Sequence, residues 1–165
     1  MEVATFRQPF RYVVPQAVLN DSHAFLHACG LDGCEGMALW VGRPASDQSK
    51  IEIMRVFVPE QVCIKSEYGV AVDMTPQAHY TLTDNLMPGE RFYIRIHSHP
   101  EEAFHSGRDD ENAVLTHQGA ISIVIPDFAR NPIRLSQCAI FQLVHGQGWT
   151  ALSKATVRQL FQEAS

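Results

Sequence analysis

The chain has 165 residues, with 13 Lys and Arg against 18 Asp and Glu and a formal charge of -5. That length fits one domain over 1–165, and 45% hydrophobic residues indicate a globular protein. The acidic balance argues against a general nucleic-acid binder, which needs a basic face. No apolar run approaches the ~18 residues of a membrane helix, and no signal peptide begins the chain. We therefore expect a cytoplasmic protein.

Alternation, apolar runs and turn residues predict secondary structure along most of the chain. The predicted elements, in order, are an extended segment over 10–14, a helix over 15–28, strands over 36–42 and 50–59, a short helix from Thr75 toward Met87, a strand over 91–99, a helix over 107–118, strands over 120–126 and 135–144, and a helix over 153–164. Residues 60–75 give no clear pattern. Strands mixed with helices predict an α/β (α+β) fold, a mixed sheet flanked by helices.

The four cysteines are too few and too scattered for a fold built on disulfides. They are Cys29, Cys34, Cys63 and Cys138. The spacing of Cys29 and Cys34 suits a zinc knuckle, but no CxxC pair accompanies them. We therefore expect four reduced thiols.

The strand predicted over 91–99 contains two histidines one residue apart. Side chains alternate along a strand, so one set faces the core and the other set faces away. The core set is Phe92, Ile94 and Ile96, and the other set is Tyr93, Arg95, His97 and His99. His97 and His99 lie roughly 6.5 Å apart at Cα in such a strand. Two imidazoles at that spacing can converge on one metal ion with bonds near ~2.0 Å; two exposed histidines are the alternative.

A turn and a helix start follow the histidines. Pro100 ends the strand, and Ser106 with Asp109 three residues later resembles a capping box. This placement brings Asp109 toward His97 and His99. Three protein ligands leave a fourth zinc position open for water, which is typical of catalytic sites. A helix cap without metal remains the alternative for the Ser–Asp pair.

Glu35 is the candidate proton shuttle. Activation of water by a metal needs a base that takes a proton and later delivers it to the leaving amine. Glu35 precedes the apolar strand over 36–42, where loss of hydration is expected to raise the pKa of its carboxyl group. A solvated loop carboxylate is the alternative.

Glu35, His97-Ser98-His99-Pro100 and Ser106-Gly107-Arg108-Asp109 together resemble the JAMM motif of the JAB/MPN metalloproteases. That motif is an upstream Glu followed by H-S/T-H-P and S-x-x-D. The resemblance covers most of the chain, because residues 34–42 are similar to the helix-to-strand junction that bears the catalytic Glu, and residues 120–126 are similar to the strand that follows the motif helix. Residues 103–110 and 122–128 resemble a bacterial branch encoded beside ubiquitin-activating and ubiquitin-conjugating homologues, including antiphage operons.

The resemblance implies a JAB/MPN fold, similar to that of cytidine deaminases. It implies one Zn²⁺ ion on His97, His99 and Asp109, with Glu35 as general base and acid. Ser106 would donate a hydrogen bond to the tetrahedral oxyanion. The implied activity is zinc-dependent cleavage after the C-terminus of a ubiquitin-like protein, whose tail is bound by strand addition. The implied partners are that protein, its conjugates and associated E1- and E2-like proteins, with no membrane.

The spacing leaves a second candidate for the third ligand. The family usually places ten residues between the second His and the Asp. Nine residues separate His99 from Asp109, and ten separate His99 from Asp110. The S-x-x-D register favours Asp109, because a loop can lose one residue at small cost.

Two other functions stay open. A non-catalytic JAB/MPN scaffold usually lacks several motif residues, whereas this chain keeps all of them. A JAB-type protein that acts on DNA or small molecules is the third possibility. Nucleobase deaminases require H-x-E together with P-C-x-x-C; His99-Pro100-Glu101 fits H-x-E, but P-C-x-x-C does not occur here.

Overall fold

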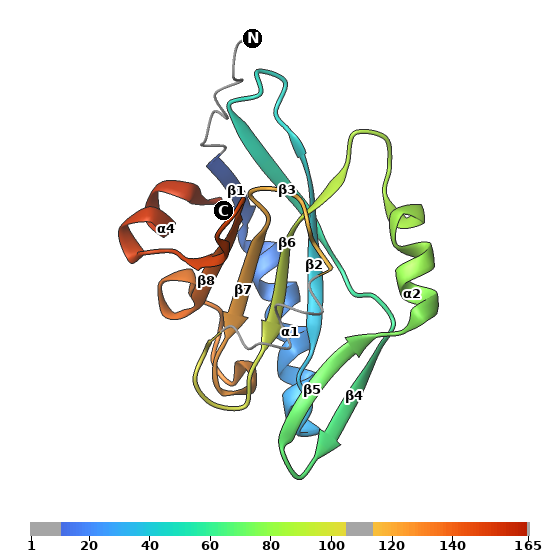
Figure 1. Cartoon of the computed structure of the whole chain (residues 1–165). Helices are drawn as coiled ribbons and strands as arrows, with labels where there is room; N and C mark the ends of the chain where they lie inside the picture. The colour runs from blue at the N-terminus through green and yellow to red at the C-terminus, as the bar shows by residue number, and fades with distance from the viewer. Residues whose placement is uncertain (1–10, 105–113, 165) are drawn as a thin grey trace.

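The computed structural model describes residues 11–104 and 114–164, which form a mixed α+β fold (Figure 1). The helices and strands are β1 (Arg11–Pro15), α1 (Gln16–Leu31), β2 (Met37–Pro44), β3 (Lys50–Phe57), β4 (Gln61–Ser66), β5 (Gly69–Met74), α2 (Pro76–Thr81), β6 (Arg91–Ser98), β7 (Ile121–Ile125), β8 (Ala139–Val144), β9 (Gly148–Ala151), α4 (Lys154–Leu160) and β10 (Phe161–Ala164). The mixed sheet with helices packed against it confirms the predicted α/β (α+β) fold class.

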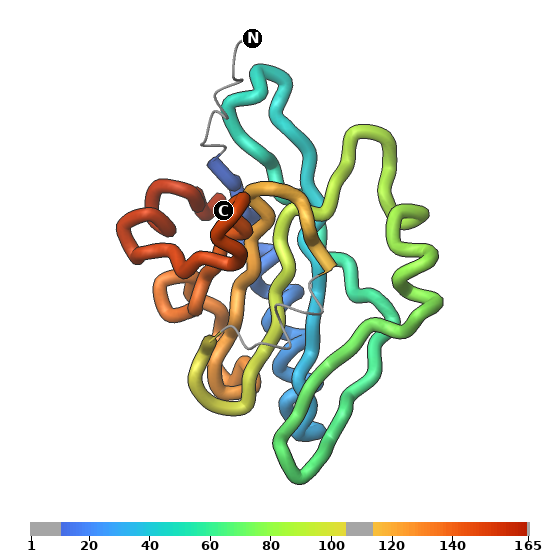
Figure 2. Tube along the Cα trace, viewed as in Figure 1, coloured from blue at the N-terminus to red at the C-terminus, as the bar shows by residue number. Residues whose placement is uncertain are grey.

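The main sheet has eight strands in the order β10-β1-β3-β2-β6-β7-β8-β9. β1 runs parallel to β10 and to β3, and β6 runs parallel to β7, whereas the remaining neighbours are antiparallel. β4 and β5 form a separate antiparallel hairpin. The hairpin, drawn in green, stands out from the main sheet (Figure 2). β6 lies at the centre of the main sheet, and its C-terminal end therefore has a strand on either side.

The sheet face against α1 holds the larger apolar core. The helix presents the predicted stripe, in which Val18, Leu19 and Leu26 are buried and Phe25 is partly buried. Across from it lie Trp40 of β2 and the isoleucines of β6 and β7. The indole N–H of the fully buried Trp40 donates to Ser22 Oγ at 2.8 Å, and that hydroxyl donates to the Val18 carbonyl at 2.7 Å. The buried polar groups of this interface are thus hydrogen-bonded, as burial requires.

The opposite face packs a smaller cluster against α2 and the hairpin. Its members are Met37, Leu39, Val41, Met74, Ala78, Phe92, Leu115 and Ala120. Thr75 caps α2 by accepting from the Ala78 N–H at 3.1 Å, with Pro76 in the first turn, as the Thr-Pro pair predicts. This second cluster packs α2 and β5 against the sheet, beside the cleft at the C-terminal end of β6.

A β-bulge between β2 and β6 makes the simple alternation predicted for residues 91–99 wrong at its start. Trp40 pairs with Ile94 and the next residue, Val41, pairs with Phe92, so Tyr93 is the extra residue. As a result Phe92 joins the cluster beside α2, and Tyr93 packs against the α1 core with its ring 6.2 Å from that of Tyr12. Downstream of the bulge the predicted alternation holds.

Three other segments differ from the predictions or were left open by them, and in two of them strand pairing determines the observed structure. Residues 60–75, which showed no clear pattern, form the β4–β5 hairpin. The helix predicted over 153–164 stops at Leu160, and 161–164 form β10, which pairs with β1. Residues 114–118 are not helical, and the rest of the helix predicted over 107–118 lies outside the described residues.

The expectation of four reduced thiols is also wrong. Cys34 and Cys63 form a disulfide, with Cα atoms 5.7 Å apart, whereas Cys29 and Cys138 are thiols. The bond joins the segment before β2 to β4 of the hairpin. The sequence could not show this pairing because the hairpin itself was not predicted. Within residues 11–104 and 114–164, no helix has both the length and the apolar character to cross a membrane.

Candidate metal centre and active site

His97 and His99 lie at the end of β6 with their imidazoles facing each other. The two side chains are 2% and 4% exposed, and their Nε2 atoms are 3.2 Å apart. Tetrahedral zinc with Zn–N bonds of about 2.0–2.1 Å places two ligand nitrogens about 3.3 Å apart. Two facing Nε2 atoms can share one proton or accept one cation between them. The donor pair therefore fits a zinc ion, and it confirms that both histidines share one side of the strand.

The backbone around His99 is held by the turn that follows β7. The His99 N–H donates to the Ile125 carbonyl at 2.9 Å, and the Phe128 N–H donates to the His99 carbonyl at 2.7 Å. Asp127, Phe128 and Ala129 have φ values of 54°, 53° and 53°. Three consecutive non-glycine residues in the left-handed region are strained, and such strain persists where surrounding contacts impose it. The turn thus fixes the backbone of one proposed metal ligand.

Glu35 reaches the same place from the loop between α1 and β2. The Gly36 N–H donates to the buried Ser98 Oγ at 3.0 Å, and the Ser98 N–H donates to the Gly36 carbonyl at 3.1 Å. Ser98, between the two histidines, therefore ties the residue after Glu35 to β6. A Cβ at Gly36 would lie 2.9 Å from Cys29 Sγ, so a larger residue at this position would displace the Cys29 side chain.

A cleft of about 1080 Å³ opens over the two histidines and Glu35. One wall is the hairpin, through residues 68–74, and a second wall is the start of α2. Three exposed aromatic side chains stand around the cleft, namely Tyr68 at 92%, Tyr80 at 88% and Phe104 at 54% exposure. Aromatic side chains this exposed beside a cleft are typical of a surface that binds a partner.

The structure brings together three of the predicted site residues: the half-buried Glu35 and the buried His97 and His99 all line this cleft. Ser106, Asp109 and the alternative ligand Asp110 lie outside the described residues. Across the ranges 11–104 and 114–164, no group of three or more His, Cys, Asp or Glu side chains is placed to hold a metal. The identity of the third ligand and the raised pKa of Glu35 remain predictions.

Sequence reasoning missed the groups that hold Glu35 in place. Ser98 lies within the motif, but its hydrogen bonds to Gly36 depend on β2 and β6 being neighbours. The β4 residues that contact the Glu35 segment were also missed. The alternation of Gln61, Cys63 and Lys65 with the β-branched Val62 and Ile64 is the signal that could have indicated a strand there.

This site, with two facing imidazoles and a carboxylate in one cleft, is of the class that metal-dependent hydrolases use. The chain is 32% identical over 148 residues to the curated protein "Probable metalloprotease y4jG" of Sinorhizobium fredii (strain NBRC 101917 / NGR234). The alignment covers 89% of this chain and 90% of that protein. The chain therefore belongs to the same metalloprotease family. No protein-family model matches the chain.

Proposed function

We propose that the protein is a JAMM-type zinc peptidase or isopeptidase that cleaves after the C-terminus of a ubiquitin-like protein, in deconjugation or in precursor processing. The observation that carries the proposal is the 3.2 Å approach of His97 Nε2 and His99 Nε2 in a cleft that also contains Glu35. Membership of a metalloprotease family supports peptide-bond hydrolysis. The JAMM assignment rests on the residue pattern given above.

His97 and His99 would hold the metal, and Asp109 is proposed as the third ligand, with Asp110 as the alternative. Zinc, when bound, supplies a Lewis acid that polarises a carbonyl and makes water nucleophilic at neutral pH. The nearly complete burial of both imidazoles holds their rings in fixed positions, which a preorganised metal site requires.

Glu35 is proposed to move the proton. Its carboxylate takes a proton from the attacking water and delivers it to the amine that leaves. The paired hydrogen bonds between Gly36 and Ser98 fix the backbone next to this carboxylate. Ser106 is proposed to donate to the oxyanion of the tetrahedral intermediate.

The cleft walls support an extended protein tail as the substrate. β5 pairs with β4 along one edge, and its residues line the cleft. An extended tail can add to the other edge of such a strand through main-chain hydrogen bonds. Tyr68 and Tyr80, both strongly exposed, are then placed to contact the folded body that carries the tail.

The first test is Glu35→Gln, with the exposed Glu60→Gln as matched control. The substrate is a ubiquitin-like protein with a fluorescent peptide fused after its terminal Gly-Gly, assayed with and without the chelator 1,10-phenanthroline. We expect Glu35→Gln to lower kcat by about 10²–10⁴ while it keeps its metal, because only the proton transfer is lost. Equal cleavage by the wild type and Glu35→Gln would contradict the mechanism.

The second test separates recognition of the tail from recognition of the folded body. Tyr68→Ala and Tyr80→Ala are expected to raise KM for the protein substrate by about tenfold or more, since exposed aromatic side chains often dominate protein binding. KM for a short peptide with the same tail should not change. Met54→Ala is the control, because Met54 is also exposed and apolar but lies on β3. An equal change for both substrates would exclude a role in binding the folded body.

A further inference from the structure

One face of β4 is attached to the segment that carries Glu35. Gln61, Cys63 and Lys65 alternate along β4 and so lie on the same side of the strand. Each of them contacts residues 32–37. The hairpin is therefore attached to the Glu35 segment at three successive positions.

The three contacts follow the segment in order, because successive inward residues of β4 contact positions 37, 34 and 32. The Gln61 amide accepts from the Met37 N–H at 2.9 Å and donates to the Met37 carbonyl at 2.9 Å, as a neighbouring strand would. Cys63 forms the disulfide with Cys34, next to Glu35. Lys65 Nζ donates to the Asp32 carbonyl at 2.6 Å.

Glu35 thus lies between two anchors. On one side, Ser98 of β6 is hydrogen-bonded to both the N–H and the carbonyl of Gly36. On the other side, Cys34 and Met37 are held by β4. The same hairpin lines the cleft through β5, so a displacement of the hairpin is passed to the backbone on both sides of Glu35.

We propose that β4 is a positioning strand for Glu35 and that the Cys34–Cys63 disulfide makes this positioning sensitive to reduction. The inference rests on the proposed role of Glu35. In the oxidised protein the carboxylate is held at the cleft for proton transfer. Reduction removes the central covalent contact and leaves Gln61 and Lys65 to hold the segment alone.

The disulfide is placed to respond to an external reductant. Cys34 and Cys63 are both half-buried, so a small reductant can reach the bond. Burial, and then the nearby Asp32, raise the pKa of the Cys29 thiol, which keeps this neighbour of Cys34 protonated and a poor attacker of the disulfide.

The test uses a water-soluble phosphine as reductant. The phosphine attacks one sulfur, the S–S bond breaks, and water supplies the oxygen of the phosphine oxide and the two protons of the new thiols. Phosphorus is thereby oxidised by two electrons and the disulfide is reduced by two. Metal content is measured before and after treatment, and the double variant Cys34→Ser/Cys63→Ser serves as a protein that the phosphine cannot change.

Two readouts are compared. Amide hydrogen exchange at Met37, whose N–H is bonded to Gln61, should become faster on reduction, while exchange at Ile94 in the core stays the same. With the short tail peptide, kcat should fall by about tenfold to a hundredfold at unchanged KM, because misplacement of a catalytic group costs rate. Reoxidation should restore kcat, and the double serine variant should be slow in both conditions.

A second variant, Gln61→Leu, tests the role of β4 while the disulfide stays intact. Gln61→Leu removes both hydrogen bonds to Met37 and should lower kcat at unchanged KM. Val62→Thr, on the opposite and exposed face of β4, is the matched control and should match the wild type.

Unchanged exchange at Met37 after reduction, or a rise in KM at constant kcat, would overturn the proposal. If no peptide or protein is cleaved in either redox state, the proposed function fails. The exchange measurement then still decides whether β4 holds the Glu35 segment.

Discussion

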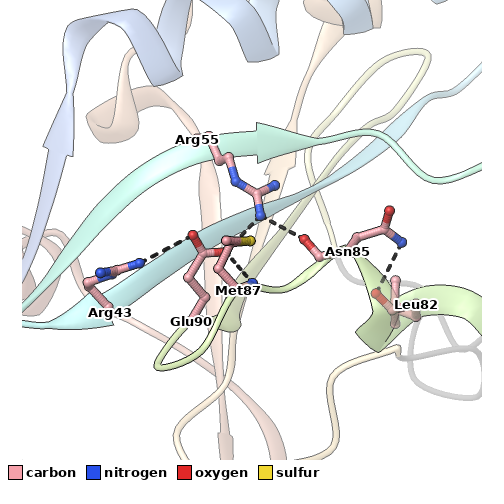
Figure 3. A network of polar contacts seen from close by, with 6 residues as sticks. All are labelled: Arg43, Arg55, Leu82, Asn85, Met87 and Glu90. Atoms are coloured by element: carbon pink, nitrogen blue, oxygen red, sulfur yellow. Dashed lines mark hydrogen bonds and ion pairs between the residues drawn. The ribbon is translucent and has the colours of Figure 1, made fainter.

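The two ends of β6 carry two polar clusters that are built in opposite ways. Just before the strand, the Glu90 carboxylate accepts from Arg55 Nη2 at 2.7 Å, from the Met87 N–H at 3.2 Å and from Arg43 Nη2 at 3.5 Å (Figure 3). At the other end, His97 and His99 direct their Nε2 atoms at each other. The first cluster joins a carboxylate to cations, and the second joins two groups of the same kind.

The difference indicates which cluster is structural. The Glu90 side chain is only 5% exposed, and its negative charge is balanced by guanidinium groups of the protein itself. Arg55 also donates to the Asn85 carbonyl at 2.8 Å, which extends this network to the loop before β6. The two facing imidazole nitrogens, by contrast, are bridged either by a shared proton or by a metal ion. A cluster that can accept a cation between its members is the better candidate for function.

The largest expected effect comes from removal of one imidazole. His97→Ala should reduce bound zinc from about one ion per chain to nearly none, because one nitrogen is left of the buried pair. His145→Ala, at the exposed turn between β8 and β9, is the control and should keep its zinc. Elemental analysis of the purified proteins measures this difference. Equal zinc in wild type and His97→Ala would contradict the assignment of the histidine pair as the metal site.

A smaller effect is expected at the residue between the histidines. Ser98→Ala leaves the buried Gly36 N–H without its acceptor, which should cost about 1–3 kcal/mol of folding stability. Denaturant unfolding measures this loss. Activity should fall more than zinc content, because the change affects the Glu35 segment while both imidazoles remain. Loss of zinc in proportion to activity would instead place Ser98 in the metal site.

Glu90→Gln should give the smallest functional effect and a change in the pH dependence of stability. The Met87 N–H, and then Arg55, lower the pKa of the Glu90 carboxyl below its ordinary value of 4.5. A lowered folded-state pKa stabilises the protein above that ordinary value, and the stabilisation is lost as the pH falls through the folded pKa. The wild type should therefore be more stable than Glu90→Gln near neutral pH, with a difference that shrinks in acid.

The control for Glu90→Gln is its zinc content, which should equal that of the wild type. Thermal unfolding at several pH values measures the stability difference. A difference that grows as the pH falls would contradict the assigned role of the carboxylate.

Local pattern was sufficient for the α1 stripe and for the histidine pair. Helical spacing placed Val18, Leu19 and Leu26 in the core, and strand alternation placed His97 and His99 on one side. Both features depend on residues close together in sequence. The bulge that turns Tyr93 to the α1 core depends on how β2 pairs with β6, and no local pattern reports that pairing.

The same reason explains what was missed around Glu35. Cys34 and Cys63 are 29 positions apart, and they meet only because the hairpin folds against the loop before β2. The bonds between Gly36 and Ser98 span 62 positions. Such long-range contacts follow from topology, so the sequence could identify the carboxylate but not the groups that hold it.

The most direct test of the metal site is anomalous scattering at the zinc absorption edge from crystals of the purified protein. We expect one peak within about 2.0–2.1 Å of both His97 Nε2 and His99 Nε2. A peak bound elsewhere, or none between the two imidazoles in zinc-containing protein, would contradict it.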